Sequence, residues 1–261
     1  MKEESIFEIY NKNSNTYPLI VSMPHSGTVI PSSIKEKLKK DAILSNSDWF
    51  LPELYDFLKN MDITILENKL NRYVIDVNRK VHKKNPIKFR TSLVFQATAY
   101  GKEIYKSSIS KKEIEDRIRF YYNPYHNTLE SLIKEKLKHF KKVYLLDLHS
   151  YYDKQENTVL ISNQNNKSSS KESLNKVSKI FRENNFKVKE NELFLGGFIT
   201  EYYGNKFKNK LECIQIELPY NIYIEDRQFG DEVVNGYDEK LFLETKNKLV
   251  EVFNKIKGLS H

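Results

Sequence analysis

The chain has almost no cysteine and no long apolar run. Cys213 is the only cysteine in 261 residues, which excludes an internal disulfide and a cysteine-rich zinc knuckle. No apolar run approaches the roughly 20 residues that cross a bilayer, and the opening segment MKEESIFEIY carries acidic residues where a signal peptide has a basic start. We therefore expect a soluble, cytoplasmic protein with no membrane partner. A metal, if bound, must be held by His, Asp or Glu.

Arginine is scarce, and the positive charge is dispersed. Seven arginines stand among 43 basic residues in a chain of net charge +8. Lysines alternate with glutamates along expected helix faces, as in KKEIEDRIRF, which is typical of a solvated face and not of a nucleic-acid surface. We therefore predict no nucleic-acid partner. Because lysine is the default cation here, each arginine is informative: its planar fork binds carboxylates through two nitrogens.

The hydrophobic content of 39% is ample for a core and predicts a single domain over residues 1–261. Four short apolar runs are predicted to be buried strands, namely PLIVSM (18–23), RYVIDV (72–77), KVYLLDL (142–148) and CIQIEL (213–218). Segments with helical spacing lie between them. This alternation predicts an α/β fold with a largely parallel sheet.

Three helices are expected from apolar spacing: one after Pro124, one after the polar stretch 163–173, and one near the C-terminus. A fourth is expected in SDWFLPELYDFLKN, where Ser47 and Asp48 are candidate caps and Pro52 lies in the first turns.

Polar residues occur where the expected strands end. His25, Arg79 and His149 follow three of them, and Glu217 lies near the end of the fourth. Because the carboxyl ends of strands in an open α/β sheet define the ligand crevice, these side chains are expected to share one edge. Taken singly, each histidine would more often be a turn residue than a ligand, and Asp48 would more often be an N-cap than a ligand.

The remaining ionisable residues are expected to be structural. Asp76 and Asp147 lie in apolar runs and should pair with neighbouring polar groups. The other four histidines are predicted to be surface residues: His82, His126, His139 and His261.

Two imidazoles and a carboxylate form the protein ligands of a catalytic zinc and leave one position for water. The metal lowers the pKa of that water, and Glu217 is placed to accept its proton and pass it to a leaving amine. Arg79 could grip a substrate carboxylate or stabilise an oxyanion. The residues thus indicate metal-assisted hydrolysis of an amide.

Seven segments resemble, in order and spacing, the N-formylglutamate amidohydrolase (N-formylglutamate deformylase) family: PHSGTVIP, SDWFLPELY, RYVIDVNR, YYNPYH, LLDLHSY, GGFITEYYG and IQIELPYNIYI. The resemblance implies a three-layer α/β/α sandwich with a mostly parallel mixed sheet, like the zinc carboxypeptidases. It also implies a Zn²⁺ or other divalent metal cofactor and hydrolysis of N-formylglutamate to formate and glutamate in histidine degradation.

The resemblance also implies roles for individual residues. His25, Asp48 and His149 look like metal ligands, with Glu53 as the alternative carboxylate. Glu217 looks like the general base and Arg79 like a catalytic contact. The substrate-binding residues that it implies are Arg72, Asn78, Ser150, Gly197 and Thr200.

Two positions depart from the family pattern, because Leu195 and Glu201 stand where many deformylases have basic residues. We therefore expect this chain to share the reaction of the family more closely than its substrate. The substrate is expected to be a small N-acyl amino acid. Two alternatives stay open. One is a carboxypeptidase-like zinc hydrolase of another amide or peptide, and the other is a basic binding protein without enzymatic activity.

Overall fold

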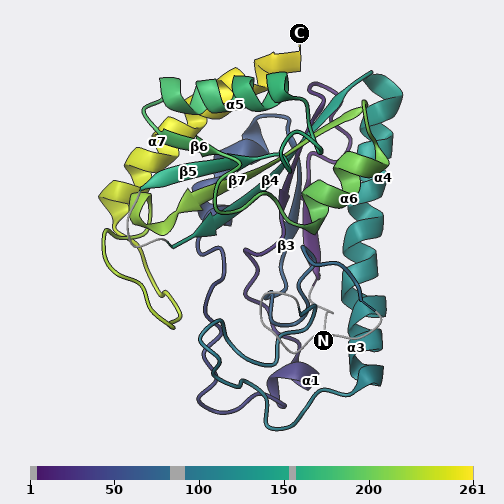
Figure 1. The fold of residues 1–261 in the computed structure, drawn as a ribbon, viewed down its shortest axis with the longest axis vertical. Helices are drawn as coiled ribbons and strands as arrows, with labels where there is room; N and C mark the ends of the chain where they lie inside the picture. Colours follow the sequence, from purple (N-terminus) through teal and green to yellow (C-terminus); the bar gives the residue numbers. More distant parts are fainter. Residues whose placement is uncertain (1–4, 83–91, 153–156, 261) are drawn as a thin grey trace.

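A computed structural model describes residues 5–82, 92–152 and 157–260. Its centre is a seven-stranded sheet with the strand order β1-β3-β2-β4-β7-β5-β6 (Figure 1). The strands are β1 (Phe7–Tyr10), β2 (Leu19–Met23), β3 (Thr64–Asn68), β4 (Val143–Tyr151), β5 (Thr158–Ser162), β6 (Lys187–Glu190) and β7 (Leu211–Pro219).

The sheet is mixed but mostly parallel. Strands β3, β2, β4 and β7 run parallel to one another, whereas β1 is antiparallel to β3 and β5 is antiparallel to β7. The carboxyl ends of β2, β4 and β7 therefore lie at one edge. In the register of β4 and β7, His149 is the partner of Glu217, which places both side chains on one face.

Helices cover both faces of the sheet and bury a separate apolar cluster on each (Figure 1). One face packs against α5 (Lys171–Glu183), α7 (Glu239–Ile256), the short α2 (Leu51–Leu54) and the 3₁₀ segment η1 (Asp56–Asn60). The other packs against α4 (Asn123–His139) and α6 (Phe198–Lys206). The predicted three-layer α/β/α architecture is confirmed.

The smaller helical elements lie at the margins of these layers. They are α1 (Ser32–Lys35), α3 (Lys111–Arg117), the π-helical η2 (Ile118–Tyr122), and the 3₁₀ segments η3 (Tyr220–Ile222) and η4 (Lys257–Ser260).

The helices expected from apolar spacing are confirmed. Leu129, Leu132 and Ile133 of α4 are buried, as are Val177 and Phe181 of α5. Apolar residues at such spacing form one stripe on a helix, and burying that stripe against the sheet stabilises each helix beyond its own propensity.

The predicted strand at 72–77 is wrong, because this apolar run forms buried turns. Its backbone groups are bonded outside any ladder: the Asp76 N–H donates to the Leu93 carbonyl, and the Val74 carbonyl accepts from the Arg117 guanidinium. A short apolar run signals burial, but it does not by itself distinguish a strand from a buried loop.

Four strands were not predicted from the sequence, namely β1, β3, β5 and β6. Edge strands β1 and β6 contain charged residues, and β3 ends in Glu67 and Asn68, so none of them reads as a continuous apolar run. β5 is a run of five residues between the end of β4 and the polar stretch 163–173, and it was not among the predicted strands. These strands are held by ladder bonds to neighbours, which no local pattern records.

The predicted cap at Asp48 is also wrong. Helix α2 begins after Phe50, and Pro52 lies in its first turn as expected. The Asp48 side chain is 2% exposed and does not cap this helix.

His126 is not the surface residue that was predicted. Its ring lies among Tyr122, Phe198 and Tyr203, and its Nε2 lies 2.8 Å from the Val77 carbonyl. His82 and His139 are exposed as expected, whereas His261 lies outside the described residues.

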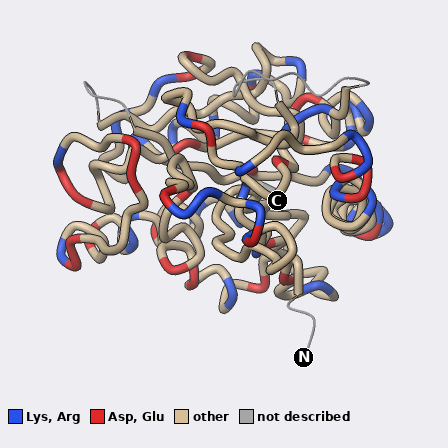
Figure 2. The backbone as a smooth tube through the Cα atoms, turned by 90° about the horizontal axis from the view of Figure 1, so that it is seen from below, with Lys and Arg blue, Asp and Glu red and all other residues tan. Residues whose placement is uncertain are grey.

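In the described part of the chain, no helix is both long and apolar enough to cross a membrane. Basic and acidic residues are interleaved along the backbone in Figure 2, in keeping with the dispersed charge of the sequence.

The partly buried His126 predicts an acid-sensitive fold. Burial lowers the pKa of His126 from 6.5 to about 4. Between these values the unfolded chain binds more protons than the folded one, so the free energy of unfolding falls as the pH drops from 6.5 to 4. We expect His126 to account for about 3 kcal/mol of this fall. Urea unfolding of wild type and His126→Gln across this range checks it, and equal pH dependences would contradict it.

Candidate metal centre

Three buried side chains from separate segments converge at the carboxyl edge of the sheet. His25 lies two residues beyond β2, His149 lies within β4, and Asp48 lies in the segment before α2. One ligand atom from each lies within 4.8 Å of the others. The His149 Nδ1 is 2.9 Å from Asp48 Oδ2, and the His25 Nδ1 is 3.9 Å from the same oxygen.

A carboxylate lies behind each histidine. The His25 Nε2 is 2.7 Å from Asp76 Oδ1, and the His149 Nε2 is 3.0 Å from Asp147 Oδ2. Both aspartates are fully buried, and these contacts confirm that they pair with neighbouring polar groups. When Nε2 carries the proton, Nδ1 keeps its lone pair free. This carboxylate–imidazole arrangement orients metal-binding histidines in proteins.

The three residues fit a divalent ion. Two imidazole nitrogens and one carboxylate oxygen suit zinc, and three protein ligands leave a position open for water or substrate. The alternative carboxylate, Glu53, is exposed on α2, away from this cluster. Asp48 is therefore the carboxylate that the fold brings to the histidines.

Two arginines share the buried carboxylate of Asp76. The Arg72 Nη2 is 2.8 Å from Asp76 Oδ2, and the Arg79 Nε is 3.5 Å from it. Arg72 is the more enclosed, with a side chain 12% exposed against 33% for Arg79. Among the described residues, the Arg72 Nε has no hydrogen-bond partner. Arg72 therefore keeps one buried N–H that no described residue satisfies.

Glu217 lies beside His149 on the neighbouring strand, and only 8% of it is exposed. Its Oε1 accepts a hydrogen bond of 2.8 Å from the Gln215 amide. Burial raises the pKa of Glu217 to about 8. A cation at the neighbouring histidines would favour its ionised form, as does the charge of Arg72.

The net pKa shifts of the two histidines have opposite directions. Burial, followed by the charge of Arg72, lowers the pKa of His25. Burial also lowers the pKa of His149, but Asp147 and Asp48 outweigh it and the net direction is upward. His25 therefore favours the neutral form that binds metals, whereas His149 has to lose a proton when a metal binds.

Asn78 joins the centre to the start of α6. Its Nδ2 lies 2.9 Å from His149 Nε2 and 3.3 Å from Asp147 Oδ2, and its Oδ1 accepts from the Ile199 N–H. Gly197 packs directly on this amide: a Cβ atom there would lie 2.3 Å from Asn78 Nδ2.

The other predicted substrate-binding residues lie near the centre in different settings. The Thr200 hydroxyl donates to the Gly197 carbonyl. Ser150 follows His149 on β4 and so lies on the opposite face of that strand. The structure thus brings Arg72 and Asn78 into contact with the centre, while Thr200 supports the Gly197 turn.

Sequence reasoning missed the residues that hold the Asp48 segment. Tyr220 and Tyr223 donate to the carbonyls on either side of Asp48, and Gln215 bonds Glu217. Their sequence signal was their position in and just after β7, in the segment IQIELPYNIYI.

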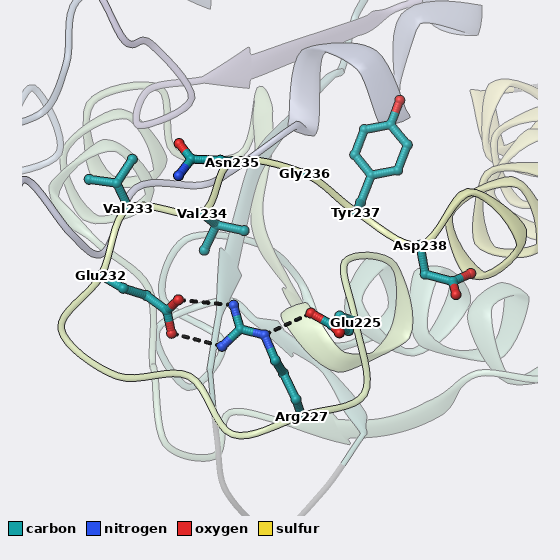
Figure 3. A pocket seen from close by; sticks show the side chains of 9 residues that line it. All are labelled: Glu225, Arg227, Glu232, Val233, Val234, Asn235, Gly236, Tyr237 and Asp238. Carbon is teal, nitrogen blue, oxygen red and sulfur yellow. Dashed lines mark hydrogen bonds and ion pairs between the residues drawn. The ribbon is translucent and has the colours of Figure 1, made fainter.

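A cavity of about 490 Å³ lies at the loop after β7 (Figure 3). Arg227 within it is bonded through two nitrogens to Glu232 and through a third to Glu225. The three converging residues do not line this cavity. The charged side chain of this cavity is thus already paired, whereas His25, Asp48 and His149 bring together atoms that could bind a metal.

Residues 17–224 match the model of the N-formylglutamate amidohydrolase family. The chain belongs to this family. It is 27% identical to the N-formylglutamate deformylase of Pseudomonas putida over 224 residues, which span 81% of this chain and 83% of that protein. It is 29% identical to the N-formylglutamate deformylase of Pseudomonas aeruginosa over 148 residues, 55% of each chain.

A solved relative has the same fold. The crystal structure of N-formylglutamate amidohydrolase from Ralstonia eutropha JMP134 superposes with a TM-score of 0.80 at 19% identity, covering 98% of both chains. Family membership confirms the expected class of enzyme, a hydrolase that acts on an amide bond.

The close packing of Gly197 predicts that Gly197→Ala displaces Asn78 from His149. We expect this overpacking to lower the free energy of unfolding by about 1–3 kcal/mol. Gly258→Ala is the matched control, since nothing lies within 4 Å of an added Cβ there. Urea denaturation of both variants measures the difference. Equal free energies of unfolding would show that Asn78 can move aside without destabilising the fold.

Proposed function

We propose that the chain is a metal-dependent amidohydrolase that cleaves the amide of an N-formyl or other N-acyl amino acid. The observation that carries this proposal is the convergence of His25, Asp48 and His149, each histidine backed by a buried carboxylate, in a member of an amidohydrolase family. Zinc is the ion that this donor set suits best.

His25, Asp48 and His149 would hold the ion. A divalent ion in such a site supplies Lewis-acid polarisation of the amide carbonyl and makes water more acidic. Glu217 carries out the proton transfers. It lies beside His149 in a buried setting. Its carboxylate accepts a proton from the attacking water and delivers it to the leaving nitrogen.

The two arginines supply positive charge for the oxygens of the substrate. The enclosed Arg72 Nε–H is suited to stabilising the negative charge that develops on the amide oxygen. Arg79, which is more exposed, is suited to gripping a substrate carboxylate. Asp76 contacts both guanidinium groups as well as the proposed ligand His25.

The acyl and side-chain groups accepted are open to experiment. N-formylglutamate is the first candidate, because two relatives are N-formylglutamate deformylases. Leu195 lies just before the Gly196–Gly197 turn that packs on Asn78, and Glu201 lies four residues after it in α6, so neither adds positive charge there. An N-acyl amino acid with a neutral or basic side chain is therefore the second candidate.

One experiment tests the proposal. Metal content is measured after purification without chelator and after reconstitution, and the loaded chain is assayed against N-formyl and N-acetyl amino acids with acidic, neutral and basic side chains. We expect about one divalent ion per chain and turnover of at least one substrate. Less than about 0.2 ion per chain with no gain on reconstitution would overturn the proposal.

Variants separate metal binding from proton transfer. His149→Ala should lose metal and activity together, because it removes a ligand. Glu217→Gln should keep its metal while kcat falls by about 100-fold or more. Metal analysis and steady-state kinetics check this pair. A Glu217→Gln protein without metal would show that Glu217 is a ligand and not the base.

Replacing either Arg72 or Arg79 by lysine should lower kcat/KM by about 10-fold or more, since lysine lacks the fork that reaches two oxygens. We expect Arg72→Lys to act mainly on kcat and Arg79→Lys mainly on KM. Arg119→Lys, at an exposed position, is the control. An unchanged kcat/KM in either variant would remove that arginine from the site.

A further inference from the structure

The segment that carries Asp48 belongs to no helix or strand. It runs between Asn46 and Phe50, both of which have a backbone φ of 59°. Such left-handed geometry is unfavourable for most residues other than glycine and persists where the surroundings enforce it. The position of the Asp48 carboxylate therefore depends on what grips this segment.

Side chains from distant parts of the chain hold three carbonyls around Asp48. The Tyr220 hydroxyl donates to the Ser47 carbonyl at 2.5 Å, and the Tyr223 hydroxyl donates to the Trp49 carbonyl at 2.9 Å. An Arg72 nitrogen donates to the Asn46 carbonyl at 2.9 Å. The carbonyls directly before and after Asp48 are thus both bonded to tyrosines.

These two tyrosines are buried and suited to this task. Tyr220 is 6% exposed and Tyr223 is fully buried, so each hydroxyl needs a partner inside the protein. Burial raises the pKa of both hydroxyls, which keeps them protonated and able to donate. Both belong to the turn that follows β7, the strand that carries Glu217.

We propose that Tyr220 and Tyr223 are positioning residues that clamp the Asp48 segment, fix its carboxylate for the metal, and tie it to the strand of Glu217. This inference rests on the proposed metal site. Among the described residues, one backbone hydrogen bond, from the Asp48 N–H to the His25 carbonyl, links Asp48 itself to the rest of the fold. The tyrosine hydroxyls therefore hold this segment where no regular secondary structure does.

The variants Tyr220→Phe and Tyr223→Phe remove one hydroxyl each and keep the ring. Tyr55→Phe is the matched control: Tyr55 is buried in the same apolar cluster as both tyrosines, and its hydroxyl has no hydrogen-bond partner among the described residues. A general loss of packing or of a buried hydroxyl would affect all three variants alike.

The first measurement is the dissociation constant for zinc, by competition with a chromophoric chelator. We expect about 10-fold weaker binding in each clamp variant and unchanged binding in Tyr55→Phe, since residues outside the ligand shell commonly contribute 10- to 100-fold to metal affinity. The visible spectrum of the cobalt-loaded chain should change in the clamp variants alone, because it reports on ligand geometry.

The second measurement needs no metal. In the metal-free chain, the amide of Asp48 should exchange with solvent faster in the clamp variants than in wild type or Tyr55→Phe. Zinc affinities within about 2-fold of wild type, with unchanged exchange, would overturn the clamp alone. A wild-type chain that binds no divalent ion would overturn the metal site and the clamp's role in it together.

Discussion

Four carboxylates are buried at one edge of the sheet, and compensating their charge is the constraint on which the site depends. Asp76 and Asp147 are fully buried, Asp48 is 2% exposed and Glu217 is 8% exposed. Arg72 and Arg79 both face Asp76, which leaves the other three carboxylates around His149. Buried charges persist only where they are paired or coordinate a metal. The raised pKa of His149 lets its imidazolium pair with Asp48 and Asp147, and a divalent ion at the proposed site would take the place of the proton that His149 has to lose.

The strands position some of these residues, and irregular chain positions the rest. The parallel β2, β4 and β7 deliver His25, His149 and Glu217 to one edge, because their carboxyl ends coincide. Asp48, the proposed carboxylate ligand, lies in irregular chain that is held by tyrosines that follow β7. The regular sheet therefore positions the two histidines and Glu217, while side-chain hydrogen bonds position Asp48.

Much of this arrangement could be predicted from the sequence. The apolar runs before His25, His149 and Glu217 form strands as expected, since continuous Val, Ile and Leu report burial on both faces. The strand predicted for the run before Asn78 was wrong. This run is equally buried, but its backbone carbonyls are bonded by side chains of α3 and α4 instead of by a neighbouring strand. Likewise, the partners of His126 and Asp48 lie far away in the chain, where no local pattern could reveal them.

Anomalous diffraction at the zinc absorption edge from zinc-soaked crystals tests the central claim most directly. The account predicts one strong peak per chain, bonded to His25, His149 and Asp48 through their Nδ1 and carboxylate atoms. A chain with no peak at these residues, or with its only peak held by other side chains, would contradict it.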